Sequence, residues 1–160
     1  MIADLLPALK KALQKALAET LLTKHGRGKD ATPELAAPNV FVGDLPPRSK
    51  GESAFPCVII TPVSGHGEGG ELYEEVAILA GVYNAEEGDA EGAEMELALL
   101  RSRIIRFLRE ALDVPVEAKF TCVRDEKERF MRWQRTDPLG QPRPFAQVAI
   151  ISRWSIPGWE

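Results

Sequence analysis

The run Gly65-His66-Gly67-Glu68-Gly69-Gly70 has the residue types and the spacing of a G-x-G-x-x-G phosphate loop. A dinucleotide site needs a helix directly after the glycines, because the helix N-terminus binds the pyrophosphate. The residues that follow, 71–75, read Glu-Leu-Tyr-Glu-Glu and predict a strand, and their carboxylates would repel phosphate. We therefore predict a flexible hairpin connection over 64–70 and no nucleotide cofactor.

Histidine and cysteine, the usual ligands of transition metals, are scarce. His66 and Glu68 are two residues apart, but zinc normally takes three or four ligands. Cys57 and Cys122 lie in separate apolar segments that predict strands, where a buried thiol is common. Whether the two thiols form a disulfide stays open, because spacing alone does not decide it. No metal site is expected.

Acidic side chains are frequent between Glu68 and Glu96. Paired carboxylates perform acid–base catalysis when burial raises the pKa of one partner. Glu86, Glu87 and Asp89 occupy a polar loop, where carboxylates are expected to stay solvated. No G-x-S-x-G motif and no defensible Ser/His/Asp or Cys/His arrangement accompanies them. We therefore predict no catalytic residue.

Two segments have the apolar spacing of a helix. Over 2–24, aliphatic residues recur at helical intervals and lysines lie mostly opposite them, which predicts an amphipathic helix. The lysines interrupt the apolar stretch and no small-residue cleavage site follows, so a signal peptide is not favoured. Over 91–112, the acids come first and the arginines later, an order that suits the helix dipole.

Alternating and β-branched runs predict five strands, at 56–63, 72–84, 116–124, 127–135 and 145–156. The centre of the second strand is apolar at nearly every position, which predicts that both of its faces are covered. The last strand places six alternating residues on one face: Ala146, Val148, Ile150, Ser152, Trp154 and Ile156.

Residues 25–54 form a long polar connector in which only 39–42, Asn-Val-Phe-Val, is capable of a short strand. Irregular stretches of this length are uncommon in compact domains. An arm that becomes ordered on assembly would explain it.

These elements predict an α+β fold: a mostly antiparallel sheet of four to six strands, with an N-terminal helix and one long helix packed on it. The 160 residues, of which 44% are hydrophobic, are expected to form a single domain over 1–160. No apolar run approaches the ~20 residues that span a bilayer, so no membrane partner is expected. The net charge of −4 argues against specific nucleic-acid binding.

Charge is distributed unevenly along the chain. Residues 1–50 carry a net charge of +3, residues 51–100 carry −11 without any Lys or Arg, and residues 101–160 carry +4. Such asymmetry predicts that an acidic surface of one copy meets a basic surface of the next. The candidate interface is Glu74, Glu75, Glu86, Glu87 and Asp89 on the acidic side, with Arg124, Arg129, Arg132, Trp133 and Arg135 on the basic side. The competing explanation is that neighbouring strands neutralise these charges within one chain.

The order of elements resembles the tail-terminator, or tail-completion, proteins of tailed bacteriophages and related particles. The resemblance depends on the N-terminal amphipathic helix, the strand opening at Phe55-Pro56-Cys57-Val58, the strand 75–83, the acidic loop, the helix 91–112 and the closing strands. It covers most of the chain but not the connector 25–54, and it contains no diagnostic motif.

This resemblance implies a structural protein without catalytic residues or cofactors. Such proteins form a ring, typically a hexamer, that caps the tail tube in the virion and contacts the head connector after assembly in the host cytoplasm. The expected partners are therefore further copies of the chain, the tail-tube protein and the head-connector protein. The alternatives are a neck or baseplate adaptor of the same particle, and a small cytoplasmic enzyme that uses Glu68, His66 or Cys57.

Overall fold

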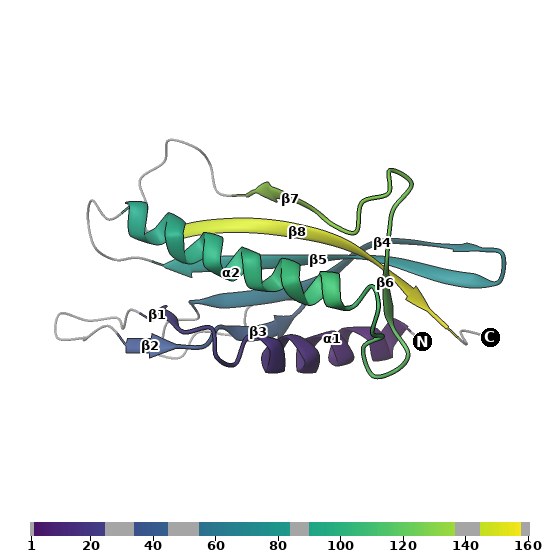
Figure 1. The fold of residues 1–160 in the computed structure, drawn as a ribbon, viewed down its shortest axis with the longest axis horizontal. Helices are drawn as coiled ribbons and strands as arrows, with labels where there is room; N and C mark the ends of the chain where they lie inside the picture. The colour runs from purple at the N-terminus through teal and green to yellow at the C-terminus, as the bar shows by residue number, and fades with distance from the viewer. Residues whose placement is uncertain (1, 25–33, 45–54, 84–89, 137–144, 158–160) are drawn as a thin grey trace.

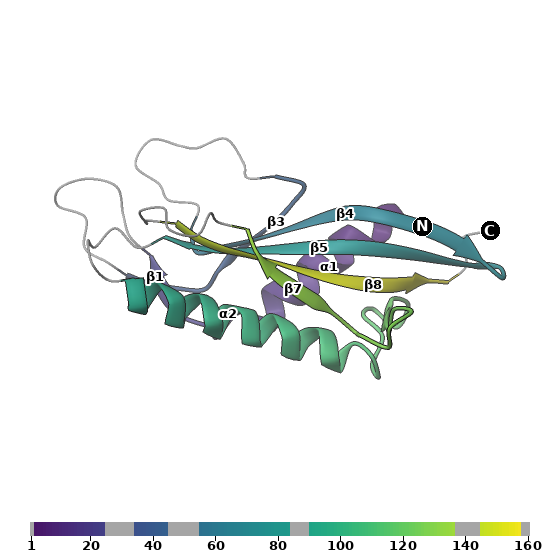
Figure 2. The same ribbon diagram turned by 90° about the horizontal axis from the view of Figure 1, so that it is seen from above.

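Two α-helices lie on one face of a six-stranded mixed sheet, and a separate two-stranded sheet completes the fold (Figures 1 and 2). The computed structural model describes residues 2–24, 34–44, 55–83, 90–136 and 145–157. Helix α1 spans Ile2–Ala16 and α2 spans Ala90–Glu110. The architecture confirms the predicted α+β class, with an N-terminal helix and a long helix packed on a mostly antiparallel sheet.

The strand order of the large sheet is β3-β4-β5-β8-β6, and β7 also pairs with β8. The β3–β4 pair is parallel and the other pairs are antiparallel. β5 pairs with one edge of β8. The other edge of β8 is shared by two short strands, since β6 pairs with 153–155 and β7 pairs with 148–151. The strands are β3 Asn39–Val42, β4 Cys57–Glu68, β5 Glu71–Tyr83, β6 Thr121–Val123, β7 Arg132–Arg135 and β8 Phe145–Ile156.

The outer edge of β4 is only partly covered. β3 pairs with 57–60, and within the described residues no strand pairs with this edge beyond Ile60. A bulge between Pro62 and Ser64 interrupts the strand. The far part of β4 and the start of β5 extend past both helices (Figures 1 and 2), and they are joined by Gly69 and Gly70, whose φ angles are 60° and 84°. Positive φ at both positions suits a tight two-residue hairpin turn, which glycine forms without strain.

Period-two alternation along the three central strands builds the core. The even-numbered side chains of β8 predicted to share one face, 146–156, are all buried, and those of β5 from Val76 to Val82 lie on the same covered face. Apart from the polar Ser152, they form one hydrophobic cluster with Leu5, Leu9 and Leu13 of α1 and with the buried stripe of α2: Leu97, Leu100, Ile104 and Leu108. Stripes of this width are what amphipathic helices bury against a sheet.

Among the described residues no helix lies on the opposite face of the sheet, and the centre of β5 is only partly covered there, where the prediction had both faces covered. Ala77 is buried there and Leu79 is half-buried, although neither belongs to the core cluster. Gly81 is covered by the ring of Phe55, since a methyl group on Gly81 would lie 2.7 Å from Phe55 Cε1. Small residues and neighbouring strands, rather than a second helical layer, therefore account for the apolar run.

The N-terminal helix is shorter than the predicted 2–24. After Ala16 the chain turns into β1, Leu22–Lys24, which pairs with β2, Glu34–Ala36. Leu21, at a predicted core position, is 52% exposed, whereas Leu22 is buried. The backbone N–H of Thr23 donates to Glu96 of α2 at 3.0 Å, so tertiary pairing replaces the helical hydrogen bonds of this segment. The rest of the connector that the structure describes contains β3, as predicted, while 25–33 and 45–54 lie outside the described residues.

Three predicted strand boundaries are also wrong. The glycine-rich segment 64–68 belongs to β4 rather than to a loop, because β5 supplies cross-strand partners for it. The expected strands 116–124 and 127–135 shrink to β6 and β7. Glu117, Ala118 and Glu128 have positive φ and place turns where the residue types indicated strands.

Candidate functional site

The glycine-rich segment 65–70, whose spacing matches a phosphate loop, forms the tip of the β4–β5 hairpin. The glycines of 65–70 are followed by strand β5, so no helix N-terminus lies beside them. His66 and Tyr73 are cross-strand partners with ring centroids 5.2 Å apart, and Glu68 is 80% exposed. Cys57 is buried near the other end of β4, about 30 Å away along an extended strand. The structure therefore does not bring Cys57 together with His66 and Glu68 in one site.

Both cysteines are free and buried. They lie on β4 and β6, which β5 and β8 separate in the sheet. Burial raises the pKa of Cys57 to about 12, and burial likewise raises that of Cys122 to about 12 against the opposing charge of Arg124. A thiol with such a pKa is almost fully protonated at neutral pH and is a poor nucleophile. Among the residues that the structure describes, no group of three His, Cys, Asp or Glu side chains could hold a metal ion.

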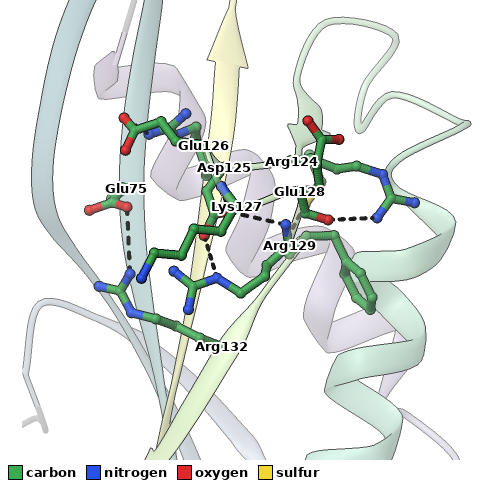
Figure 3. A network of polar contacts seen from close by, with 11 residues as sticks. Glu75, Arg124, Asp125, Glu126, Lys127, Glu128, Arg129 and Arg132 are labelled. Atoms are coloured by element: carbon green, nitrogen blue, oxygen red, sulfur yellow. Dashed lines mark hydrogen bonds and ion pairs between the residues drawn. The ribbon is translucent and has the colours of Figure 1, made fainter.

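The predicted basic side of the interface begins in a tight turn between β6 and β7 (Figure 3). The Asp125 carboxylate accepts the N–H groups of Lys127 and Arg129 at 2.8 and 3.0 Å, and the Arg129 side chain at 2.9 Å. Burial opposes the ionised form of Asp125, but these hydrogen bonds outweigh it and lower the pKa of the carboxyl. Arg124 donates to the Glu128 carbonyl at 3.2 Å. Both arginines therefore stabilise their own turn.

The other two arginines pair with acids of their own chain, one of which, Glu75, belongs to the predicted acidic side. Arg132 Nη1 lies 3.9 Å from Glu75 Oε1 across the open face of the sheet, and Arg135 pairs with Glu94 of α2 (Figure 3 shows the first pair). The competing explanation, that neighbouring elements neutralise each other's charge, therefore holds for these two pairs. Trp133 is 46% exposed, and the Arg101 guanidinium lies 4.0 Å from its ring centroid.

Adjacent carboxylates of the predicted acidic side lie on opposite faces of the sheet. Glu75 accepts the Ser64 hydroxyl at 2.8 Å on the open face. Glu74 is buried on the helix-covered face opposite Trp154, and burial raises the pKa of its carboxyl. It is therefore not a freely exposed surface charge, contrary to the prediction. The remaining members, Glu86, Glu87 and Asp89, lie outside the described residues.

The sequence reasoning missed a groove where the end of α1 approaches the second half of α2. Its volume is about 360 Å³. Ala16, Glu19 and Thr20 line one side, and Arg103, Arg106, Phe107 and Glu110 line the other. We call this site the inter-helix groove. The helical repeat places Arg103, Arg106 and Glu110 on one side of α2, but the arginines were explained by the helix dipole alone.

Within the residues that the structure describes, neither helix is long and apolar enough to cross a membrane. Two surface features are distinct in the described residues. The β4–β5 hairpin projects past the helices, and the inter-helix groove is a hollow between α1 and α2. The chain matches no protein-family model and no curated protein.

Proposed function

We propose that this protein is a structural component of a phage tail or a related particle. Copies of the chain form a ring that caps the tail tube and joins it to the head connector. The proposal is supported by the order of elements, since an N-terminal helix, a β-hairpin, a long helix and closing strands follow one another as the resemblance implies. In this proposal the protein is assembled into the tail in the host cytoplasm and is then a part of the virion.

The observation that carries the proposal is the shape and charge of the β4–β5 hairpin. It extends past the helices (Figure 1), and residues 51–100, which include it, contain no Lys or Arg. An acidic arm that leaves its own subunit has a basic surface of another subunit as its natural partner. Contact between two different surfaces is heterologous, and heterologous contacts close into rings or continue as filaments.

Sedimentation velocity of the full chain tests this proposal, alone and with tail tubes assembled from the tube protein of the same genome. We expect a closed species whose mass is a small multiple of 17.6 kDa, either in solution or on the tube end. Electron microscopy of capped tubes should show a ring at one end only. A monomer under both conditions would contradict the proposal, and capture by baseplate or neck proteins instead of tubes would favour the adaptor alternative.

A further inference from the structure

We propose that the hairpin tip of one copy, residues 64–73, docks in the inter-helix groove of the next copy. This inference rests on the proposed self-association and names the two surfaces that meet. It replaces the predicted acidic residues with Glu68 and Glu71 of the hairpin tip, and it moves the basic side from the β6–β7 region to the helices.

The groove lining contains Arg103 and Arg106 as well as Glu19 and Glu110, and its arginines are only weakly engaged within the described residues of their own chain. Arg103 is exposed and has no ion pair or hydrogen bond with any residue that the structure describes. The Arg106 side chain is 68% exposed, and its one partner among the described residues is Glu110, at 3.3 Å on the surface. Exposed ion pairs of this kind contribute little and exchange readily. By contrast, Arg124, Arg129, Arg132 and Arg135 each bind a partner in their own subunit.

The cations beside the groove are not required to balance the helix ends. The last carbonyls of α2 are satisfied by the following residues, for example by the N–H of Val114 at 3.0 Å from the Glu110 oxygen. α1 ends in the same way, with the N–H of Leu17 at 2.9 Å from the Leu13 oxygen.

The hairpin tip has complementary chemistry. It carries Glu68 and Glu71, and its opposite strands are held by the stacked His66 and Tyr73 rings. Guanidinium groups bind carboxylates through two parallel hydrogen bonds, so Arg103 and Arg106 are suited to these glutamates. The half-buried Phe107 gives the groove an apolar wall against which an aromatic pair can rest.

The occupant must come from a second copy. The hairpin is part of the rigid sheet and points past the ends of both helices, so it cannot fold back onto its own groove (Figures 1 and 2). A small molecule fits the groove less well. The walls are mostly charged and exposed, whereas ligand pockets are mostly apolar and enclose their ligand.

Charge reversal on each surface tests the contact. The tip variant is Glu68→Arg with Glu71→Arg, and the groove variant is Arg103→Glu with Arg106→Glu. Each alone brings like charges together, and we expect its self-association to weaken about tenfold or more, measured by sedimentation in the condition where the wild type assembles. The matched control, Lys11→Glu with Arg109→Glu, makes the same charge change on the helices outside the groove and should retain association within about threefold.

Mixing the two variants separates a lost contact from misfolding. In an equal mixture, each arginine tip meets a glutamate groove and each glutamate tip meets an arginine groove. We expect assembly to return to near the wild-type level in the mixture, and also in the chain that carries all four changes. Variants that assemble normally alone, or a mixture that stays dissociated, would overturn the docking while leaving the proposed ring intact. A wild type that stays monomeric alone and on tubes would overturn both.

Discussion

The neighbouring residues Glu74 and Glu75 of β5 lie on opposite faces of the sheet, and their carboxyl groups have different surroundings. Glu75 lies on the open face, where it binds Ser64 and Arg132. Glu74 lies on the other face, cross-strand from the fully buried Trp154, and no hydrogen bond or ion pair within the described residues compensates its charge. Because a carboxylate in such surroundings is costly, Glu74 stabilises the fold less when ionised than when protonated.

Replacing Glu74 with Gln should therefore stabilise the protein at pH 7. The raised pKa means that wild-type stability falls as the pH rises through the folded-state pKa of Glu74, and the benefit of Gln should vanish below about pH 4.5, where both states are protonated. We expect the thermal midpoint at pH 7 to rise by roughly 2–4 °C, the shift that about 1 kcal/mol gives at this chain length.

Glu75→Gln provides the matched control for that measurement. It removes the charge that Arg132 faces and weakens the Ser64 hydrogen bond, so the midpoint should stay constant or fall slightly. A lower midpoint for Glu74→Gln than for the wild type at pH 7 would contradict the assignment of Glu74 as a costly buried charge.

At the scale of elements, the β4–β5 hairpin depends on close contact between its strands. A methyl group on Gly65 would overlap Glu74 Oε2 and lie 2.9 Å from the carbonyl oxygen of Tyr73. At Gly67 the nearest atom would be the Glu71 carbonyl oxygen at 3.7 Å, an ordinary contact. Gly65 is therefore required by the pairing, whereas Gly67 is not.

Gly65→Ala should lower the free energy of unfolding by roughly 1–3 kcal/mol, because the backbone oxygen of Tyr73 cannot move away freely. Gly67→Ala should change it by about 0.5 kcal/mol or less. Urea unfolding of both variants measures the difference. Equal stabilities would show that the strands separate easily at Gly65.

The elements that the sequence predicted best are the long periodic ones. α2 and β8 match their expected ranges within a few residues, because their apolar spacing persists over many positions and tertiary contacts only reinforce it. The short strands were predicted poorly. Glu117 and Glu128 adopt positive φ, which the side-chain type does not signal, and the parallel pairing of β3 with β4 has no local signature.

The candidate site was predicted only in part for a similar reason. Arg135 and Glu94 are 41 residues apart, so their pairing follows from how β7 approaches α2 and not from any motif. Likewise, Glu74 differs from Glu75 only by strand parity. The period of two along a strand assigns Glu74 to the same face as the buried Val76 and Ile78. The density of acidic residues around it points instead to an acidic surface, and that signal is misleading here.

At the scale of the whole molecule, the helices and the projecting hairpin carry opposite charge. Lys15 and Arg103 on the helices are exposed and have no ion pair within the described residues, while the hairpin contributes Glu68 and Glu71. Association through these surfaces should depend on salt, since ionic strength screens exposed charges.

Raising NaCl from 0.1 to 1 M shortens the screening length from about 10 to 3 Å and should weaken self-association by about tenfold or more. Sedimentation across a salt series measures this, and the groove and tip variants should show a smaller or inverted dependence. Association that strengthens with salt would indicate an interface dominated by apolar contact.

The edge of β4 beyond Ile60, which no described strand covers, bears on aggregation. A long row of free backbone groups invites strand addition and growth into amyloid-like stacks. Here Pro62 lacks an N–H and the adjacent bulge breaks the regular spacing, so an incoming chain cannot run in register along the edge. Within the described residues, this part of β4 is therefore a poor template for the addition of a strand from a second copy.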